Sequence, residues 1–304
     1  MKIAIIGAGA MGSLYGGYLS KVAKEVYLVD IWQEHIEAIN KSGLKIEEAD
    51  KDIVVHPKAV TTAETVGHVD LAIIFVKSIM TGMALEKNSA LLGPDTMVLS
   101  LQNGYGNIDQ ICKYVKIDNV IAGTTAHGAT MLAPAHIKHG GTGETHIGLV
   151  VKKEDKRIHN IAKLLREAGF STIISDNVME LIWSKLIINV GINALTAIFK
   201  VENGKLLKFE ETKDLMTMAV KEAVKVAKAS GIIFDEEAMI KKVMEVTYNT
   251  SENKSSMLQD ILNKRKTEID TINGAIVKEG EKYLISTPVN LVLTNMIKSL
   301  EKGI

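Results

Sequence analysis

A polar stripe interrupts the apolar run of residues 181–199. Lys185, Asn189 and Asn193 recur there at every fourth position. Residues four apart on an α-helix differ in direction by only about 40°, so the three side chains lie along one face. An ammonium group can donate a proton and amides can hold polar oxygens, which suits the reduction of a carbonyl group. Because these groups need partners in a dry core, the stripe is predicted to line a cleft.

Further polar candidates lie in two later segments and in one earlier one. Ser256 lies in SSMLQD, Glu268 in KTEIDTING and Asn103 in LQNG. Asn103 follows a strand-like run, at the end of the strand where open α/β sheets place ligand contacts. Each residue also has a simpler interpretation: Ser256 as a helix start, Glu268 as an exposed helix residue, and Asn103 as part of a turn.

A glycine-rich loop near the start of the chain is typical of dinucleotide binding. GAGAMG follows a short apolar run and opens a helical pattern. Its three glycines suit a tight turn, a close approach to a pyrophosphate, and close packing of helix on strand. The alternative is a glycine turn that binds no phosphate. The loop residues predicted to contact a cofactor are Gly7, Ala8, Gly9, Ala10, Met11 and Gly12.

Asp30 indicates which dinucleotide the loop would take. It ends the second strand-like run, where a carboxylate can accept hydrogen bonds from the adenosine ribose of NAD. A 2′-phosphate would meet its negative charge, and no arginine occurs in the next ten positions. NAD(H) is therefore the expected cofactor, with NADP(H) as the alternative. Asp30 could instead only cap the following helix.

The elements that must position these residues change in type along the chain. Strand-like runs at 2–7, 25–30, 69–77 and 96–104 alternate with helical patterns at 10–22, 33–42, 80–91 and 107–114, which predicts a parallel sheet covered on both faces. Residues 43–60 resemble an inserted hairpin, and 120–150 read as antiparallel strands with a glycine-rich turn. Helical patterns prevail from 178. The predicted fold is α/β: a Rossmann-type cofactor-binding domain (1–175), then an all-helical substrate domain (176–304), with a cleft between them.

Composition excludes several classes of function. Lys plus Arg and Asp plus Glu both number 36, so no net field favours nucleic acid or an anionic membrane surface. The polar residues inside 181–199 argue against a membrane span. The single cysteine, Cys112, cannot form an intramolecular disulfide or a cysteine-only metal site. A cytoplasmic enzyme or binding protein is expected, and no metal site is predicted.

Several sequence blocks together resemble the ketopantoate reductases (2-dehydropantoate 2-reductases). The blocks GTTAHGA and THIG accompany the glycine loop, and LIWSKLIINVGINALTA, SSMLQDI and TEIDTINGAIV are specific to the family. The resemblance extends over nearly the whole chain. It implies NAD(P)H-dependent reduction of 2-dehydropantoate to (R)-pantoate, a step toward pantothenate and coenzyme A.

The resemblance also implies roles for individual residues. Lys185 matches the general acid, and Glu268 the carboxylate that holds substrate and cofactor. The residues that match the groups around the substrate are Asn103, Asn189, Asn193 and Ser256. Those expected at the cofactor beyond the glycine loop are Asp30, Lys77, Asn103 and Glu268. Met80 stands where a glutamine is common, and His127 is expected to be structural rather than an acid or base.

Two other functions remain open at this point. One is a related reductase of another 2-keto or 3-hydroxy acid, since fold alone does not select the substrate. The other is an NAD(P)H-binding regulator without turnover. The helical domain could also present an apolar face to a second subunit and form a homodimer.

Overall fold

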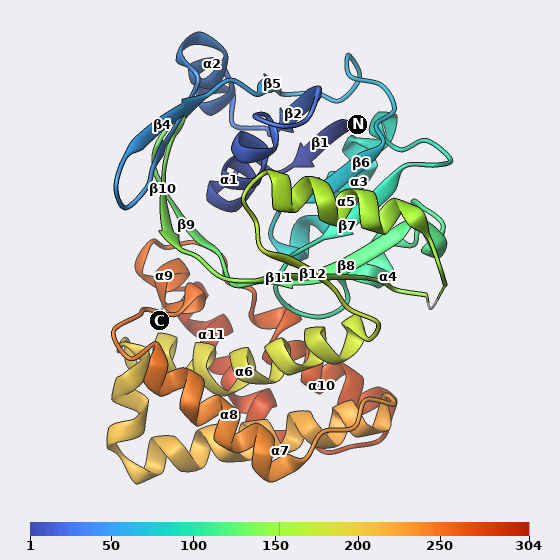
Figure 1. Ribbon diagram of the computed structural model, residues 1–304. Helices are drawn as coiled ribbons and strands as arrows, with labels where there is room; N and C mark the ends of the chain where they lie inside the picture. The colour runs from blue at the N-terminus through green and yellow to red at the C-terminus, as the bar shows by residue number, and fades with distance from the viewer. Residues whose placement is uncertain (152, 304) are drawn as a thin grey trace. The chain divides into compact units, whose positions relative to one another are not determined.

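The computed structural model describes residues 1–151 and 153–303 (Figure 1). The chain divides into two compact units. Unit 1 comprises Met1–Gln102 and Asn107–Val178, and unit 2 comprises Asn103–Gly106 and Met179–Ile304. The long segments meet near the predicted boundary of 175, whereas no sequence pattern indicated that 103–106 joins the second unit.

Unit 1 is built on an eight-stranded sheet. In spatial order its strands are β12 (Thr172–Ile174), β11 (Thr145–Leu149), β8 (Val120–Thr125), β7 (Met97–Ser100), β6 (Leu71–Ile74), β1 (Lys2–Ile6), β2 (Glu25–Val29) and β5 (Lys58–Val60). The strands from β5 to β8 are all parallel, in the order of the two mononucleotide-binding halves of a Rossmann fold. The predicted α/β class is confirmed. β5 lies inside segment 43–60, which was predicted as a hairpin. The hairpin prediction therefore holds only for the residues before β5.

A smaller four-stranded sheet comes from two hairpins distant in sequence. β3 (Leu44–Glu47) pairs with β4 (Asp52–Val55), and β9 (Gly128–Ala133) pairs with β10 (His136–Gly141). β3 and β10 join the hairpins in parallel. The tight turn between β9 and β10 contains Ala135, with φ +53°. The predicted glycine-rich segment lies at the end of β10 and before β11.

Helix α1 (Ala10–Leu19) contacts both sheets, which explains why it is buried on nearly every side. A Cβ at Gly16 would lie 2.2 Å from the Leu28 side chain in the main sheet. A Cβ at Gly17 would lie 2.9 Å from the Ile46 side chain in the smaller sheet. These glycines let the helix approach both layers closely. Because α1 begins at the glycine loop, this packing fixes the direction of the loop.

The other helices of unit 1 follow the strands. They are α2 (Gln33–Ser42), α3 (Thr81–Lys87), α4 (Asn107–Ile111) and α5 (Lys156–Glu167), with short 3-10 turns η1 (Ser78–Met80), η2 (Ser89–Leu91) and η3 (Ile117–Asn119). Asp155 caps α5 by accepting a hydrogen bond from the Arg157 backbone N–H. No helix was predicted over the residues of α5, and no strand over those of β12.

Unit 2 is helical, as predicted. Its elements are α6 (Val178–Phe199), η4 (Asn203–Lys208), α7 (Glu210–Ala229), α8 (Glu236–Asn249), α9 (Ser256–Leu262), η5 (Ile269–Thr271), α10 (Asn273–Lys282) and α11 (Pro288–Glu301). A core cluster forms around α6 and includes Trp183, Val190 and Leu195. By length and composition α6 could cross a membrane, but most of it is buried inside the protein, which is typical of a core helix.

Candidate active site

The glycine loop connects β1 to α1, and its three glycines have different surroundings. A Cβ at Gly7, whose φ is +94°, would lie 2.7 Å from the backbone nitrogen of Val76. A Cβ at Gly12 would lie only 1.9 Å from the Gly7 carbonyl oxygen. At Gly9, the N-cap of α1, a Cβ would meet no atom within 4 Å. The fold itself therefore requires Gly7 and Gly12, whereas Gly9 leaves open space at a helix N-terminus, where a phosphate is stabilised.

Asp30 accepts hydrogen bonds from two backbone N–H groups, one of which belongs to the glycine loop. Ala8 donates to Asp30 Oδ2 at 2.6 Å, and Trp32 donates to Asp30 Oδ1 at 3.0 Å. His35 is fully buried, and burial lowers the pKa of its imidazole, so His35 is neutral at pH 7 and supplies no positive charge beside the carboxylate. The Asp30 carboxylate therefore lies beside the glycine loop, at the end of β2.

A polar network connects the loops after β6 and β7, and none of its members was predicted to be a site residue. Gln102 Nε2 donates to the Val76 carbonyl at 2.7 Å and to Thr81 Oγ1 at 2.8 Å. Asn107 accepts from Thr81 Oγ1 at 3.1 Å. This network surrounds the turn that begins at Lys77, the N-cap of η1. The only available signal was that Gln102 directly precedes the predicted site residue Asn103.

In unit 2, Asn103 lies on a short loop. Tyr105 of this loop contacts both the segment that carries Lys185 and the segment that carries Glu268. Tyr105 N–H donates to the Thr271 carbonyl at 2.8 Å, three residues after Glu268. The Tyr105 ring also contacts the Trp183 ring on α6, with centroids 4.8 Å apart. The structure thus brings together three segments far apart in sequence.

Lys185 is a predicted site residue whose pKa is strongly altered by its surroundings. Burial lowers the pKa of its ammonium group to about 8, and the negative charge of Glu268 acts in the opposite direction. An ammonium group with such a pKa can release a proton near neutral pH. On the same helix Asn193 is buried and Asn189 is partly buried.

Ser256 was predicted to contact the substrate, but its surroundings give little information about a ligand. It is exposed at the first position of α9. The neighbouring Ser255 is the one that caps the helix, because its hydroxyl accepts from the Leu258 N–H at 3.1 Å. Ser255 is buried and hydrogen-bonded to Thr196 of α6 at 2.7 Å, so it fastens α9 to that helix.

Known protein families match both parts of the chain. The family described as "Ketopantoate reductase PanE/ApbA" matches residues 3–152, and "Ketopantoate reductase PanE/ApbA C terminal" matches residues 177–301. The chain belongs to the ketopantoate reductase family. The resemblance predicted from the sequence blocks is confirmed.

Several known proteins match the chain over nearly its whole length. A 2-dehydropantoate 2-reductase of Pyrococcus abyssi is 39% identical, covering 99% of this chain and 98% of the relative. One of Halobacterium salinarum is 33% identical, covering 99% of both. A ketopantoate reductase structure from Ralstonia eutropha JMP134 has a TM-score of 0.91 at 33% identity, covering 99% of both chains. A D-mandelate dehydrogenase with NADH and anilino(oxo)acetate has a TM-score of 0.94 at 34% identity, covering 100% of this chain and 99% of the other.

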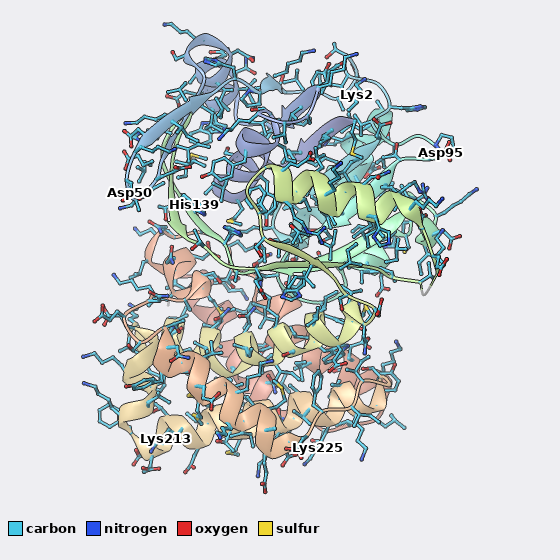
Figure 2. The ribbon with its side chains drawn as sticks, in the orientation of Figure 1. Lys2, Asp50, Asp95, His139, Lys213 and Lys225 are labelled. Carbon is cyan, nitrogen blue, oxygen red and sulfur yellow. The ribbon has the colours of Figure 1, made fainter. Side chains whose placement is uncertain are left out.

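His127 lies in an aromatic cluster of unit 1. Its Nδ1 is 3.1 Å from His139 Nε2, and its ring meets the Phe170 and Tyr15 rings edge-on (His139 is labelled in Figure 2). Burial lowers the pKa of His127, and the neighbouring His139 lowers it further. These contacts support a packing role for His127 in this member of the ketopantoate reductase family.

Proposed function

We propose that this protein reduces 2-dehydropantoate to (R)-pantoate with a nicotinamide dinucleotide as hydride donor. The observation that carries the proposal is the Lys185 ammonium group, whose pKa of about 8 suits a general acid, within a chain that matches 2-dehydropantoate 2-reductases from end to end. The open space at Gly9 and the carboxylate of Asp30 fit the pyrophosphate and ribose of the cofactor.

Each residue has a defined task in this reaction. A bound reduced nicotinamide would supply a hydride to the keto carbon, and the substrate oxygen would then need a proton. Lys185 Nζ donates that proton and is left as a neutral amine, which solvent protonates again. Glu268 keeps Lys185 charged before the transfer, because its negative charge raises the pKa of the ammonium group. Asn103, Asn189, Asn193 and Ser256 are proposed to hold the substrate oxygens without adding charge.

A second candidate is reduction of an aryl 2-keto acid, favoured by the likeness to D-mandelate dehydrogenase. Both candidates need the same acid and cofactor, so the substrate decides between them. Steady-state assays with NADH should give a higher kcat/KM for 2-dehydropantoate than for phenylglyoxylate. The reverse order would favour the second candidate, and bound NADH that no keto acid oxidises would favour a regulator without turnover.

Asp30 leads to a prediction about cofactor choice. We expect kcat/KM to favour NADH over NADPH by roughly tenfold or more, because the 2′-phosphate would lie beside a carboxylate and the ten positions after Asp30 contain no arginine. Asp30→Asn should narrow this ratio, whereas Glu34→Gln, which removes an exposed carboxylate from the first turn of α2, should not. A wild-type preference for NADPH would refute the assignment.

The pKa of Lys185 leads to a prediction about pH. The acid must be protonated for reduction, so kcat/KM should hold steady below about pH 8 and fall as pH rises above it. Because Glu268 raises this pKa, Glu268→Gln should move the fall to lower pH. Glu245→Gln, which removes an exposed carboxylate from α8, serves as the control. An unchanged profile in Glu268→Gln would show that Glu268 does not tune the acid.

A further inference from the structure

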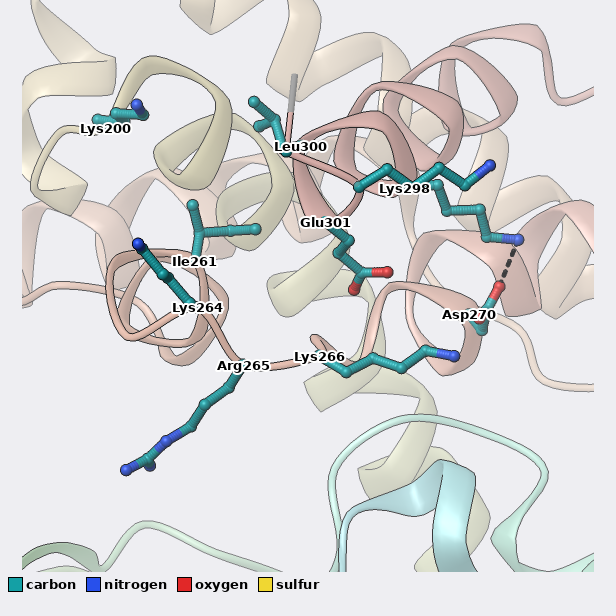
Figure 3. Close-up of a pocket in the computed structure, with 11 residues that line it drawn as sticks. Lys200, Ile261, Lys264, Arg265, Lys266, Asp270, Lys298, Leu300 and Glu301 are labelled. Atoms are coloured by element: carbon teal, nitrogen blue, oxygen red, sulfur yellow. Dashed lines mark ion pairs between the residues drawn. The ribbon is translucent and has the colours of Figure 1, made fainter.

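A pocket of about 870 Å³ in unit 2 is lined by charged side chains near the ends of α6, α9 and α11 (Figure 3). Asp270 pairs there with Lys298 at 2.5 Å, drawn as the dashed line, and Arg265 extends away from the other labelled side chains. This lining therefore does not converge on a ligand as the polar groups of a binding site do. A more closely connected set of polar groups lies beside the glycine loop of unit 1.

His35 on α2 is a fully buried histidine with a polar partner at each ring nitrogen. The Ala135 backbone N–H donates to His35 Nδ1 at 3.0 Å. Nδ1 is therefore the unprotonated nitrogen, and the hydrogen of the neutral ring is on Nε2. Because Nε2 lies 3.1 Å from Ser13 Oγ, His35 donates to the Ser13 hydroxyl. The turn between β9 and β10, which contains Ala135, thus selects the tautomer of the ring.

Ser13 on α1 connects His35 to the glycine loop. Its hydroxyl accepts from His35 and donates its own hydrogen to the Ala8 carbonyl at 2.8 Å. Ser13 and Ala8 are both buried, so this carbonyl points into the protein. The Ala8 N–H donates to Asp30 Oδ2, so both backbone polar groups of Ala8 have partners.

The Ala8 carbonyl determines the direction of the next backbone donor. It shares a peptide unit with the Gly9 N–H, and this unit is trans, as are all peptide bonds of the described residues. In a trans unit the C=O and the N–H point in opposite directions. Because Ser13 holds the carbonyl toward the buried side, the Gly9 N–H points away from that side. Gly9 is the N-cap of α1, in the part of the loop assigned to the pyrophosphate.

We propose that His35 is a positioning residue for the dinucleotide cofactor. Through Ser13 it holds the Ala8–Gly9 peptide unit in the orientation that presents an N–H to a phosphate. A neutral histidine suits this task, because one nitrogen of its rigid ring accepts and the other donates. His35 has this role only if the glycine loop binds the cofactor, so the proposal rests on the proposed function.

Two substitutions of His35 each retain one side of the ring. The asparagine amide oxygen is as many bonds from Cα as Nδ1, so His35→Asn can accept from Ala135 but cannot reach Ser13. The glutamine amide N–H is as many bonds away as Nε2, so His35→Gln can still donate to Ser13. Fluorescence titration of the full-length chain with NADH should show roughly fivefold weaker binding for His35→Asn, and binding within about twofold of the wild type for His35→Gln. His159→Asn, at an exposed position of α5, is the control and should bind as the wild type does.

Ser13→Ala tests whether His35 acts through the Ser13 hydroxyl. This variant should bind NADH about as weakly as His35→Asn does. Adding His35→Asn to it should weaken binding no further, because both changes break the same connection. At saturating NADH, kcat should stay near the wild-type value in these variants, since Lys185 and Glu268 are unchanged.

Equal NADH affinity of His35→Asn and His35→Gln would overturn the role of His35, whether both match the wild type or both are weaker. Additive weakening in the double variant would also overturn it. Either result leaves NADH binding by the wild type, and with it the proposed reductase activity, intact. Absence of NADH binding by the wild type would instead overturn the cofactor site of the proposed function, and the role of His35 with it.

Discussion

Replacement of Lys185 by alanine is expected to lower kcat by on the order of 10² or more, the scale of a lost general acid. The substrate oxygen would then have to take its proton from water. NADH affinity should change little, because the glycine loop and Asp30 remain intact. Steady-state kinetics and a fluorescence titration with NADH measure the two effects separately. Near-wild-type turnover would exclude Lys185 as the acid.

Two further substitutions distinguish proton donation by Lys185 from an effect of its positive charge alone. Lys185→Arg keeps a positive charge, but a guanidinium group does not give up its proton in a protein, so the rate should fall about as far as in the alanine variant. Lys242→Ala removes a nearby lysine whose Nζ donates to Ser184 Oγ at 2.9 Å, and it should leave kcat close to the wild-type value. High activity in Lys185→Arg would indicate that only the charge is needed.

Local patterns were sufficient to predict the Rossmann core and the polar face of α6. Buried parallel strands are continuous apolar runs, and a stripe at every fourth residue is visible without a structure. The pattern of α5 was also visible, since Ile158, Ile161, Ala162 and Leu165 are its buried face, yet it was not assigned. The sequence therefore contained enough information to predict this helix.

Other features depend on contacts between residues far apart in sequence. β5 follows the β3–β4 hairpin closely in sequence, so its place in the main sheet becomes apparent only from its pairing with β2. The attachment of Tyr105 to Thr271 and Trp183 needs the fold of unit 2, because no local pattern distinguishes that loop from an ordinary turn. The altered pKa of Lys185 likewise depends on burial, which periodicity alone does not quantify.

The second large effect is expected at Gly9, where alanine should weaken NADH binding by roughly 100-fold. The backbone there has φ −60°, which alanine adopts readily, and the added Cβ meets no atom of the protein. The apo protein should therefore fold normally and even gain up to about 1 kcal/mol in free energy of unfolding. The methyl group would instead occupy the space that the pyrophosphate needs, and would prevent charge-assisted hydrogen bonds to the helix N-terminus.

Gly12→Ala is the matched control, because the same substitution at that position should lower the free energy of unfolding. Its Cβ would lie 1.9 Å from the Gly7 carbonyl oxygen, so α1 must move away from β1. We expect a loss of about 3 kcal/mol in free energy of unfolding, in the range of overpacked sites. Urea unfolding of the apo variants and NADH titration give the two quantities for each. If Gly9→Ala instead bound NADH as the wild type does, the open space at Gly9 would not be where the pyrophosphate lies, and the cofactor assignment would have to move away from this loop.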